Sequence, residues 1–480
     1  MPSWQFDWKL LTTLFYISEW ILRLLAIVWV PQRRSPSAAK MWLLLIFLEP
    51  WLGFLAYWIV GSVSLKQTRS RKREKRLKAW ATRYDPLHQS ASEIPEEQKQ
   101  RLTQAVLLAE NLGRMPILGG NSAELLADYD LTIDRMVADI DAARQSVHLL
   151  YYILEDDLVG RKVADALLRA KKRGVQTRLL VDALASRAAG RKFLPELREA
   201  GIDAFEMLPV GLFAKRLARF DVRNHRKLAV IDGRTGYIGS QNLVDANFKK
   251  GIVNEEMVAR VTGPVVVEFQ CIFADDWYLT TGRPLEGSDA FPEVPRTGNA
   301  YGQLLPSGPG YPTENNQRLF VAFIYGARER VVITTPYFIP DDALLQALQT
   351  AVLRGVDVHM VVPYKADQIL VGWAQRSYYE ELLECGVKIH QYRERFLHAK
   401  HLTIDDAVTI IGSSNMDLRS FSLNLELSLI LYDRDVTARM HREQERYFAG
   451  STLLTRDAWA RRTAFTKIGQ NIARLFSPLL

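Results

Sequence analysis

The sequence contains very little cysteine. Only Cys271 and Cys385 occur among 480 residues. Neither has a partner at the C-x2-C spacing that is typical of metal-binding or redox pairs, which argues against both functions for these thiols. We expect each cysteine to be a small buried hydrophobic residue. A single disulfide between them is the alternative, and no other feature of the sequence supports it.

Beyond residue 78 the sequence also lacks net positive charge. Of the net charge of +8, +7 lies in residues 66–78 and +2 in residues 1–65, so the remaining residues carry −1. Enzymes that bind nucleic acid without sequence preference need many Lys and Arg contacts to phosphate, so this distribution argues against that class. The hydrophobic content of 48% excludes general disorder and is sufficient for two globular cores and membrane segments.

Two long apolar stretches lie near the N-terminus. Residues 41–65 contain one ionisable side chain, Glu49, and are long enough to cross a hydrocarbon core of roughly 30 Å. Residues 10–30 contain Glu19 and Arg23, which are four positions apart and can pair on one helical face. We therefore predict two transmembrane helices; for the first stretch, a cleaved signal peptide is the alternative.

The basic segment 66–78 directly follows the second apolar stretch. By the positive-inside rule it places both termini and the large C-terminal part in the cytoplasm. The same segment can also attract anionic lipid headgroups, and the two roles are compatible.

After a polar connector, predicted to be helical, at residues 79–110, short β-branched segments alternate with helical ones. One strand, helix, strand series is repeated later with the same Arg-Gly-Val at the helix-to-strand turn, which indicates duplicated parallel βαβ units. The predicted segments are 146–154, 160–174 and 175–183, and then 330–340, 341–355 and 356–363. We expect an α/β fold with two duplicated α/β/α sandwich domains related by pseudo-twofold symmetry. The expected divisions are a membrane anchor (1–65), a polybasic segment and connector (66–110), and domains at 111–300 and 301–480.

One motif, H-x-K-x4-D-x6-G-S-x-N, occurs twice without a gap. It begins at His225 and at His398, and N-x-E follows each copy. Repeated identities at one spacing are a strong signal, because structural residues rarely specify two such sets in register. The candidate site residues are His225, Lys227, Asp232, Ser240, Asn242 and Glu256 in the first copy, and His398, Lys400, Asp405, Ser413, Asn415 and Glu426 in the second.

The spacing of the motif suggests its chemistry. Side chains two apart in a strand share a face, so each histidine is expected beside its lysine, and two adjacent strands would form one pocket. One imidazole can attack phosphorus, the other can protonate the leaving oxygen, and the lysines can hold phosphoryl oxygens, so neither metal nor cofactor is needed.

The motif aspartates and the later glutamates receive different roles. Although Asp232 and Asp405 belong to the catalytic motif, they lie an odd number of residues after the lysines, and Asp232 precedes Gly233, a hairpin signal. We therefore favour a structural role for both aspartates. Glu256 and Glu426 become the candidates for the carboxylates that orient the histidines.

These motifs resemble those of the phospholipase D superfamily, and nearly the whole chain resembles the bacterial cardiolipin synthases within it. The matching segments are SAAKMWLLLIFLEPWLGFLAYWIVG, VRNHRKLAVIDG, TPYFIPDD, FLHAKHLTIDD, GSSNMDLRSF, NLELSL and the closing SPLL. Departures are small: His401 and Asp406 stand where many relatives have a smaller residue and a glycine. We expect His401 to face away from the pocket as a packing or surface residue.

The resemblance implies a phosphohistidine intermediate that an acceptor alcohol displaces. His225 is then the nucleophile and His398 the general acid and later base, with the reverse order left open. The resemblance also implies that Lys227, Lys400, Asn242 and Asn415 bind phosphate.

The function predicted from these features is cardiolipin synthesis from two phosphatidylglycerol molecules, with release of glycerol. The expected location is the bacterial inner membrane, with the catalytic domains on the cytoplasmic side and phosphatidylglycerol and anionic lipids as partners. A hydrolytic phospholipase D, or a transferase using another alcohol such as ethanolamine, has the same pocket chemistry and stays open. The charge distribution disfavours a nucleic-acid phosphodiesterase, and the intact motifs disfavour an inactive membrane scaffold. The sequence does not define the oligomeric state.

Two further segments mix apolar and basic residues. Residues 207–224 and the C-terminal residues 455–480 are both able to rest on a membrane surface. Packing on the catalytic body, or an ordinary exposed helix or loop, is the alternative for each.

Overall fold

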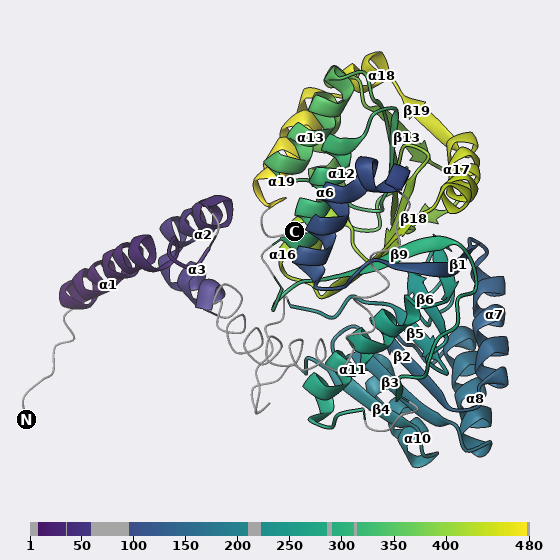
Figure 1. The fold of residues 1–480 in the computed structure, drawn as a ribbon. Helices are drawn as coiled ribbons and strands as arrows, with labels where there is room; N and C mark the ends of the chain where they lie inside the picture. Colours follow the sequence, from purple (N-terminus) through teal and green to yellow (C-terminus); the bar gives the residue numbers. More distant parts are fainter. Residues whose placement is uncertain are drawn as a thin grey trace, which may run out of the picture.

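The computed structural model describes residues 8–34, 36–58, 96–209, 222–285, 290–311 and 314–477. An α/β body stands beside a helical arm formed by the N-terminal residues (Figure 1). The polybasic segment 66–78, the end of the second predicted span and most of the 207–224 stretch lie outside the described residues.

The arm consists of α1 (Trp8–Trp29), α2 (Pro36–Leu48) and α3 (Pro50–Ala56). Within the described ranges, α1 is the one helix that is long and apolar enough to cross a membrane, by length and composition. The predicted pair in this helix forms, because Arg23 Nη1 lies 3.4 Å from Glu19 Oε2. A second membrane-spanning helix is not established by the structure.

The prediction of one continuous helix over residues 41–65 is wrong in its described part. The chain leaves helical geometry at Glu49, where φ is −137° and ψ is 89°, and α3 begins at Pro50. Proline has no N–H to donate to the preceding turn, and its ring pushes the residue before it out of the helical region. Gly53 then lets α3 fold back on α2, since a Cβ at this position would lie 2.7 Å from Ile46 Cα.

The body is built on one mixed sheet of fifteen strands, in the order β19-β13-β12-β10-β15-β16-β18-β9-β1-β8-β6-β5-β2-β3-β4. Strand β9 joins the two halves, because it pairs antiparallel with β18 on one side and with β1 on the other. The first half contains β1 (Leu118–Leu126), β2 (Ser146–Tyr151), β3 (Gln176–Asp182), β4 (Asp203–Met207), β5 (Leu228–Ile231), β6 (Thr235–Gly239) and β8 (Val258–Thr262). The second half contains β9 (Ala300–Ser307), β10 (Arg330–Thr334), β12 (Asp357–Pro363), β13 (Lys388–Tyr392), β15 (His401–Ile404), β16 (Val408–Gly412), β18 (Glu426–Tyr432) and β19 (Ser451–Leu454).

Both predicted βαβ units are present. Strand β2 pairs parallel with β3 across α8 (Leu158–Lys172), and β10 pairs parallel with β12 across α13 (Asp342–Leu353). Each helix has an aspartate N-cap, Asp157 or Asp341, whose carboxylate accepts a backbone N–H of the first turn. The repeated glycine of the helix-to-strand turn has a left-handed backbone, with φ of 89° at Gly174 and 86° at Gly355, a conformation that glycine adopts without steric cost.

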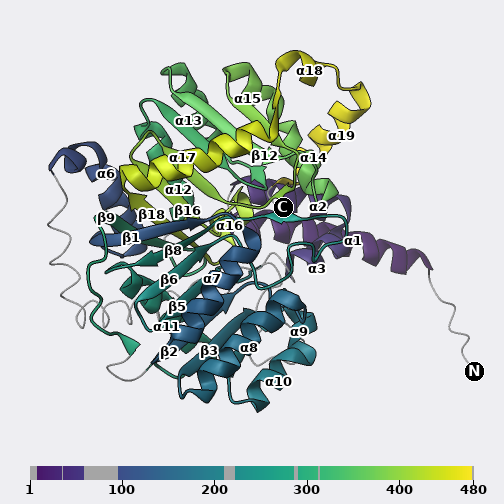
Figure 2. The same ribbon diagram turned by 90° about the vertical axis from the view of Figure 1, so that its right-hand side faces the viewer.

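Helices cover both faces of the sheet (Figures 1 and 2). In the first half, α7 (Tyr129–Ala142), α8 and α10 (Phe193–Glu199) share one core, while α11 (Val266–Thr281) covers the other face. In the second half, α12 (Asn315–Gly326), α13, α14 (Ile369–Ser377) and α15 (Tyr379–Cys385) share a core with α6 (Glu96–Gly113), and α17 (Arg434–Ala449) lies opposite. Helix α6 confirms the helical connector over its described part. The short elements are α9 (Arg187–Arg191), α16 (Leu418–Ser422), α18 (Arg456–Ala460) and α19 (Ala464–Leu475).

Two small sheets lie outside the main one. Strand β7 (Asn254–Glu255) pairs with β14 (Phe396–Leu397), and β11 (Phe338–Ile339) pairs with β17 (Met416–Asp417). The first of these joins the N-x-E segment of one half to the chain just before His398 of the other. Cys271 and Cys385 are free thiols and are partly rather than fully buried.

Candidate active site

The two His-Lys pairs lie beside strands and not within them, contrary to the prediction. His225 and Lys227 precede β5, and His398 and Lys400 lie between β14 and β15. The spacing of two still brings each lysine back to its histidine: Lys227 Nζ donates to the His225 carbonyl and Lys400 Nζ to the His398 carbonyl, both at 2.7 Å.

The backbone of each motif is held by the other half of the chain. His225 N donates to Leu425 O at 2.9 Å, and His398 N donates to Glu255 O at 2.8 Å. Leu425 and Glu255 are the middle residues of the two N-x-E segments. These inter-half hydrogen bonds replace a regular strand ladder, which explains why the motif histidines fall outside the main sheet.

The histidine and glutamate side chains pair crosswise between the halves. His225 Nδ1 lies 3.0 Å from both carboxylate oxygens of Glu426, and His398 Nδ1 lies 2.7 Å from Glu256 Oε1. An ionised carboxylate only accepts, so Nδ1 carries the proton in both rings and Nε2 is the nitrogen left to react. The sequence suggested Glu256 and Glu426 as the carboxylates that orient the histidines. It did not indicate that each glutamate would pair with the histidine of the opposite half.

The two glutamates differ in their support. Glu426 is fully buried and accepts hydrogen bonds from Ser413 Oγ at 2.5 Å and Ser420 Oγ at 3.0 Å. Glu256 is also buried, and its pKa is lowered first by the charge of His398, with smaller contributions from Lys400 and nearby Ser240, although burial acts in the opposite direction. The motif serines therefore lie behind the glutamates. Each serine hydroxyl also accepts a backbone N–H at 3.0 Å, from Met257 for Ser240 and from Leu427 for Ser413.

In the free enzyme, burial favours the neutral form of both imidazoles. It lowers the pKa of His225 to about 4, although the Glu426 charge acts in the opposite direction. The pKa of His398 is also lowered, first by burial, with Glu256 opposing. Both side chains remain slightly open to solvent, His225 at 11% and His398 at 14% exposure. A neutral ring can attack phosphorus through Nε2, and an exposed edge is where a substrate has to arrive.

The two lysines lie close enough to repel each other. Burial, followed by the charge of Lys400, lowers the pKa of Lys227 to about 7, and burial lowers that of Lys400 to about 8. Tyr152 lies beside this pair, with its ring centroid 5.2 Å from Lys227 Nζ and 4.8 Å from the His225 ring centroid. Two buried, poorly compensated ammonium groups form a site to which an anionic phosphoryl group is attracted.

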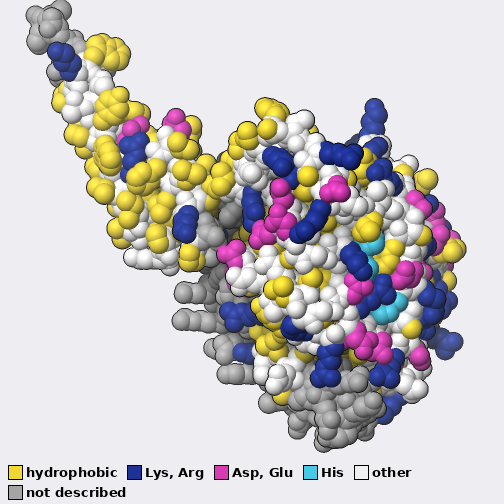
Figure 3. Space-filling model, turned by 90° about the horizontal axis from the view of Figure 1, so that it is seen from above, with side chains coloured by type: hydrophobic (Ala, Val, Ile, Leu, Met, Phe, Trp, Pro, Cys, Tyr) yellow, Lys and Arg dark blue, Asp and Glu magenta, His cyan; other side chains and the backbone are white. Residues whose placement is uncertain are grey.

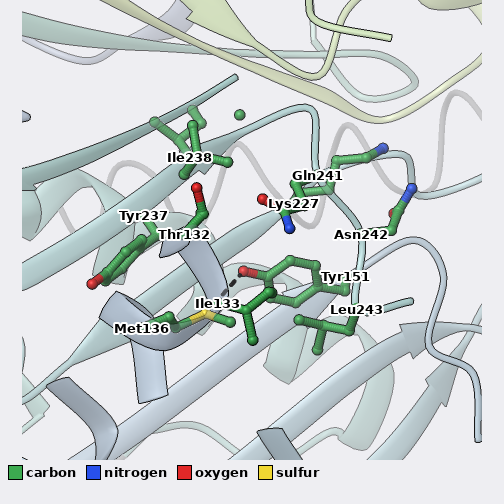
Figure 4. Close-up of a pocket in the computed structure, with 12 residues that line it drawn as sticks. Thr132, Ile133, Met136, Tyr151, Lys227, Tyr237, Ile238, Gln241, Asn242 and Leu243 are labelled. Carbon is green, nitrogen blue, oxygen red and sulfur yellow. Dashed lines mark hydrogen bonds between the residues drawn. The ribbon is translucent and has the colours of Figure 1, made fainter. Parts of the chain in front are cut away.

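The motif asparagines flank the lysines. Asn242 Oδ1 accepts the Ile153 N–H at 3.2 Å. A small, largely apolar cavity is lined by Lys227 and Asn242 and extends toward α7 through Ile133 and Met136 (Figure 4). Neither histidine lines this cavity, so it is not the space between the two imidazoles. In the second half, Asn415 Oδ1 is buried and has no hydrogen-bond partner within the described ranges.

The two motif aspartates are not brought to the histidines. Both sit in left-handed turns, with φ of 52° at Asp232 and 51° at Asp405. Each carboxylate accepts three consecutive backbone N–H groups at the start of a neighbouring strand, at 2.7–3.2 Å. These donors are Arg144, Gln145 and Ser146 for Asp232, and Arg328, Glu329 and Arg330 for Asp405. Asp232 and Asp405 therefore stabilise the ends of strands and do not contact the histidines. The odd spacing of both aspartates, and the Asp-Gly pair at Asp232, indicated this structural role.

Sequence reasoning missed a buried ion pair beneath the site. Arg226 Nη1 lies 2.5 Å from Asp276 Oδ2, and the Arg226 Nε–H donates to the Glu426 carbonyl at 3.0 Å. Arg226 therefore holds the backbone of the residue that pairs with His225. The H-R-K triplet offered a signal at Arg226, but nothing in the sequence connects it with Asp276.

His401, which the sequence assigned a packing or surface role, is buried in the body. Its Nδ1 lies 3.2 Å from Gln444 Nε2, and its ring stacks near Tyr447. Across the described part of the chain, no three His, Cys, Asp or Glu side chains are grouped so as to hold a metal ion.

Known proteins share this arrangement of sequence and fold. The family model described as "Cardiolipin synthase, PLD-like domain" matches residues 136–277 and 320–448. Cardiolipin synthase A of Pectobacterium carotovorum subsp. carotovorum (strain PC1) is 35% identical over 458 residues, with 94% of each chain covered. Cardiolipin synthase A of Yersinia pseudotuberculosis serotype IB (strain PB1/+) is 34% identical over the same length, again with 94% of each chain covered.

Solved structures give the same fold. The crystal structure of phosphatidylserine synthase from Haemophilus influenzae Rd KW20 superposes with a TM-score of 0.60, at 15% identity, over 78% of this chain and 97% of that one. At this identity the likeness concerns the fold alone. Fold and family match together define a phospholipase D-like protein of the α/β class. Within that class, the chain belongs to the cardiolipin synthase family.

Proposed function

We propose that this chain is a cardiolipin synthase that transfers a phosphatidyl group between two phosphatidylglycerol molecules and releases glycerol. The family match and the relatives aligned over 94% of the chain make it an enzyme of the phosphatidyl-transfer class. The observation that carries the proposal is the crossed pairing of His225 with Glu426 and of His398 with Glu256, which presents two Nε2 atoms of neutral rings beside two buried lysines.

In the first step, Nε2 of His225 attacks the phosphorus of the donor lipid. The P–O bond to the glycerol headgroup breaks, and His398, which in the complex with the anionic donor is protonated at Nε2 as well as at Nδ1, donates the Nε2 proton to the leaving oxygen. The phosphatidyl group remains bonded to His225. Burial lowers the pKa of His225 to about 4, and hydrogen bonds from Ser413 and Ser420 fix the Glu426 carboxylate that orients it, which supports His225 as the neutral nucleophile.

In the second step, a hydroxyl of another phosphatidylglycerol attacks the same phosphorus. The His398 ring, now deprotonated, accepts the hydroxyl proton; the P–N bond breaks and His225 is regenerated. The products are cardiolipin and the unchanged enzyme, so atoms and charge balance over the cycle.

The remaining motif residues are assigned to the phosphate. Lys227 and Lys400 hold its non-bridging oxygens, and Asn242 and Asn415 donate to it through Nδ2. For Asn242 this role is supported by the Ile153 N–H, which occupies Oδ1 and leaves the Nδ2 group for the phosphate. Ser240 and Ser413 support the glutamates, while Asp232 and Asp405 support the strands.

The proposed organisation is a duplicated one. Two equivalent α/β/α units, at 111–300 and 301–480 and related by a pseudo-twofold axis, would each contribute one His-Lys pair and one glutamate. The recurrence of the βαβ unit and the reciprocal exchange of glutamates support this division.

The proposed location is the bacterial inner membrane, with the catalytic body on the cytoplasmic side. The apolar helix α1 and the basic segment 66–78 support this placement. The apolar composition of residues 41–65 supports a second membrane segment, which completes the proposed multi-pass anchor.

The second candidate is transfer of the phosphatidyl group to water or to another alcohol, since the same pocket serves each acceptor. The test is to incubate purified full-length protein with phosphatidylglycerol in detergent and to follow lipid products and free glycerol. Cardiolipin and glycerol in equal amounts are expected. Phosphatidic acid without cardiolipin would refute the synthase and leave the hydrolase.

A further inference from the structure

Helix α19 turns its apolar side away from the body. Phe465, Ile468, Ile472 and Leu475 follow one another at intervals of three, four and three residues, so they form a single stripe along the helix. All four are exposed, Phe465 at 78% and the others at 52–58%. The side that packs on the body carries Gln470 and Ala473, which are almost fully buried. A helix that only stabilises a globular core is expected to have the opposite orientation.

The stripe continues onto α14. Ile369, Leu370 and Trp373 lie on one face of this helix and are also exposed, Ile369 at 79%. The Trp373 indole packs on Gly469 of α19, where a Cβ would come within 2.4 Å of the ring. The two helices therefore form one surface, named here the α14–α19 ridge: Ile369, Leu370, Trp373, Phe465, Ile468, Ile472 and Leu475. An exposed apolar surface of several large side chains marks an interaction site.

Basic residues outnumber acidic ones around the ridge. Residues 461–477 contain Arg461, Arg462, Lys467 and Arg474 and no acidic residue. Glu380 and Glu381 of nearby α15 compensate part of this charge, because Glu380 pairs with Arg462 at 2.7 Å and Lys467 at 3.7 Å, and Glu381 pairs with Arg474 at 3.1 Å. The basic residues still exceed these acidic ones, so a net positive charge remains. Apolar side chains flanked by basic ones are the combination that binds the interface of an anionic bilayer.

The ridge is connected to the candidate active site through a short series of contacts. Asp367, two residues before α14, accepts the Tyr337 hydroxyl at 2.9 Å. The Tyr337 ring lies 6.5 Å from the Phe396 ring, and Phe396 lies 6.1 Å from the His398 ring, measured between centroids. The segment just before α14 is therefore linked to His398 through Tyr337 and Phe396, which places the ridge a short distance from the candidate active site.

The arm lies on the same side of the molecule. Figures 1 and 2 place α14 and α19 on the part of the body that faces α1–α3. Figure 3 shows hydrophobic side chains gathered along the edge of the body nearest the apolar arm.

We infer that the α14–α19 ridge is a membrane-docking surface, which inserts its apolar side chains among the acyl chains of an anionic bilayer and holds the active site against the lipid surface. This inference deepens the proposed function, on which its catalytic consequence rests. It gives the C-terminal segment a role in presenting phosphatidylglycerol that is separate from the anchoring role of α1.

A direct test uses the full-length protein in vesicles of phosphatidylcholine and phosphatidylglycerol. Cys271→Ser and Cys385→Ser remove the native thiols, and Ile472→Cys then carries an environment-sensitive fluorophore. Leu158→Cys, an equally simple change at an 81% exposed leucine on α8, is the matched control. Lipids brominated in their acyl chains should quench the label at position 472 and leave that at position 158 unchanged. If brominated lipids do not quench the label at position 472, the inference is overturned. Quenching by aqueous iodide would then mean that the label faces water, and quenching by neither would mean that a second copy or the arm covers it.

A kinetic test measures the consequence for catalysis. Ile468→Glu combined with Ile472→Glu should lower the rate on phosphatidylglycerol in vesicles by about tenfold, because charged groups resist insertion. The rate of this double variant on a dispersed short-chain phosphatidylglycerol should not change. The control variant Leu158→Glu should keep the wild-type rate on both the vesicle and the dispersed substrate. Equal loss on both substrates, or none on vesicles, contradicts docking. If the label at position 472 is quenched but the unlabelled wild-type enzyme makes no cardiolipin, the proposed function is refuted and docking stands.

Discussion

His225 and Glu426 are 201 residues apart in the chain, yet both carboxylate oxygens of Glu426 lie 3.0 Å from His225 Nδ1. The reciprocal pair, His398 and Glu256, is 142 residues apart. Each half of the protein therefore orients the imidazole of the other. Neither half can form a complete site alone, and this requirement explains why the two halves share one continuous sheet.

Removing the charge of Glu426 should impair catalysis without unfolding the protein. In Glu426→Gln, the side-chain amide no longer stabilises the imidazolium or enforces one tautomer, and we expect kcat to fall by about 10²- to 10⁴-fold. The measurement is cardiolipin formation from phosphatidylglycerol in detergent, together with the thermal midpoint. Glu255→Gln, which changes the carboxylate next to Glu256 that pairs with Arg446 and Arg395, is the control and should retain most of the activity. Near-normal turnover of Glu426→Gln would contradict the orienting role.

The two histidines should fail at different steps. With a phosphatidyl ester of p-nitrophenol, whose leaving group needs no proton, His398→Ala should release one equivalent of nitrophenol and accumulate phosphohistidine on His225. His225→Ala should release none. Mass spectrometry of the digested protein locates the modified residue. Phosphorylation of His398 in His225→Ala would reverse the assignment.

Anion binding should be coupled to proton uptake by the buried lysines. At pH 8, Lys227, with a pKa of about 7, is mostly neutral in the free enzyme, and Lys400, with a pKa of about 8, is about half protonated. A bound anion raises both pKa values, so protons are taken up. Sulfate is a suitable probe because it does not titrate near pH 8, and calorimetry in buffers of different ionisation enthalpy counts the protons. Lys227→Met should take up fewer protons than the wild type. Equal uptake by both would argue against the low pKa of Lys227.

The same lysines predict how stability depends on pH. Their folded-state pKa values are below the usual value of 10.5, so between these pH values the unfolded chain binds more protons than the native one. The contribution of these lysines to the free energy of unfolding should therefore rise as the pH increases from about 7 toward 10.5. Lys227→Met should show a smaller rise than the wild type in denaturant titrations over pH 7–9. An identical slope in both would contradict the prediction.

Asp232 should matter for stability rather than chemistry. In Asp232→Ala, three backbone N–H groups at the start of β2 lose their acceptor, and an alanine must adopt a φ of 52°. We expect a loss of about 2–4 kcal/mol in the free energy of unfolding, measured by denaturant titration. Asp232→Asn, which tolerates the left-handed conformation, should be milder. The folded variants should keep kcat near that of the wild type. A large loss of kcat at unchanged stability would return Asp232 to the chemistry.

The sequence predicted those features that depend on short-range patterns. The βαβ units follow from local periodicity and from the glycines at positions 174 and 355, whose left-handed turns are a local property. The repeated motif indicated the paired histidines and lysines, and the odd spacing of the aspartates indicated that they belong to turns. The uninterrupted helix expected at 41–65 fails for an equally local reason, Pro50, whose effect on the preceding residue outweighs the hydrophobicity of the segment.

Only the tertiary structure decided how the two halves are joined. That β9 pairs with both β1 and β18, that Glu426 faces His225 and not His398, and that Arg226 meets Asp276 are contacts between residues distant in sequence. Periodicity specifies which face of an element is apolar, but not which element covers it. The orientation of α19 shows the same limit: its composition indicates an amphipathic helix, while the packing of Gln470, Ala473 and Gly469 on the body determines that the apolar stripe faces outward.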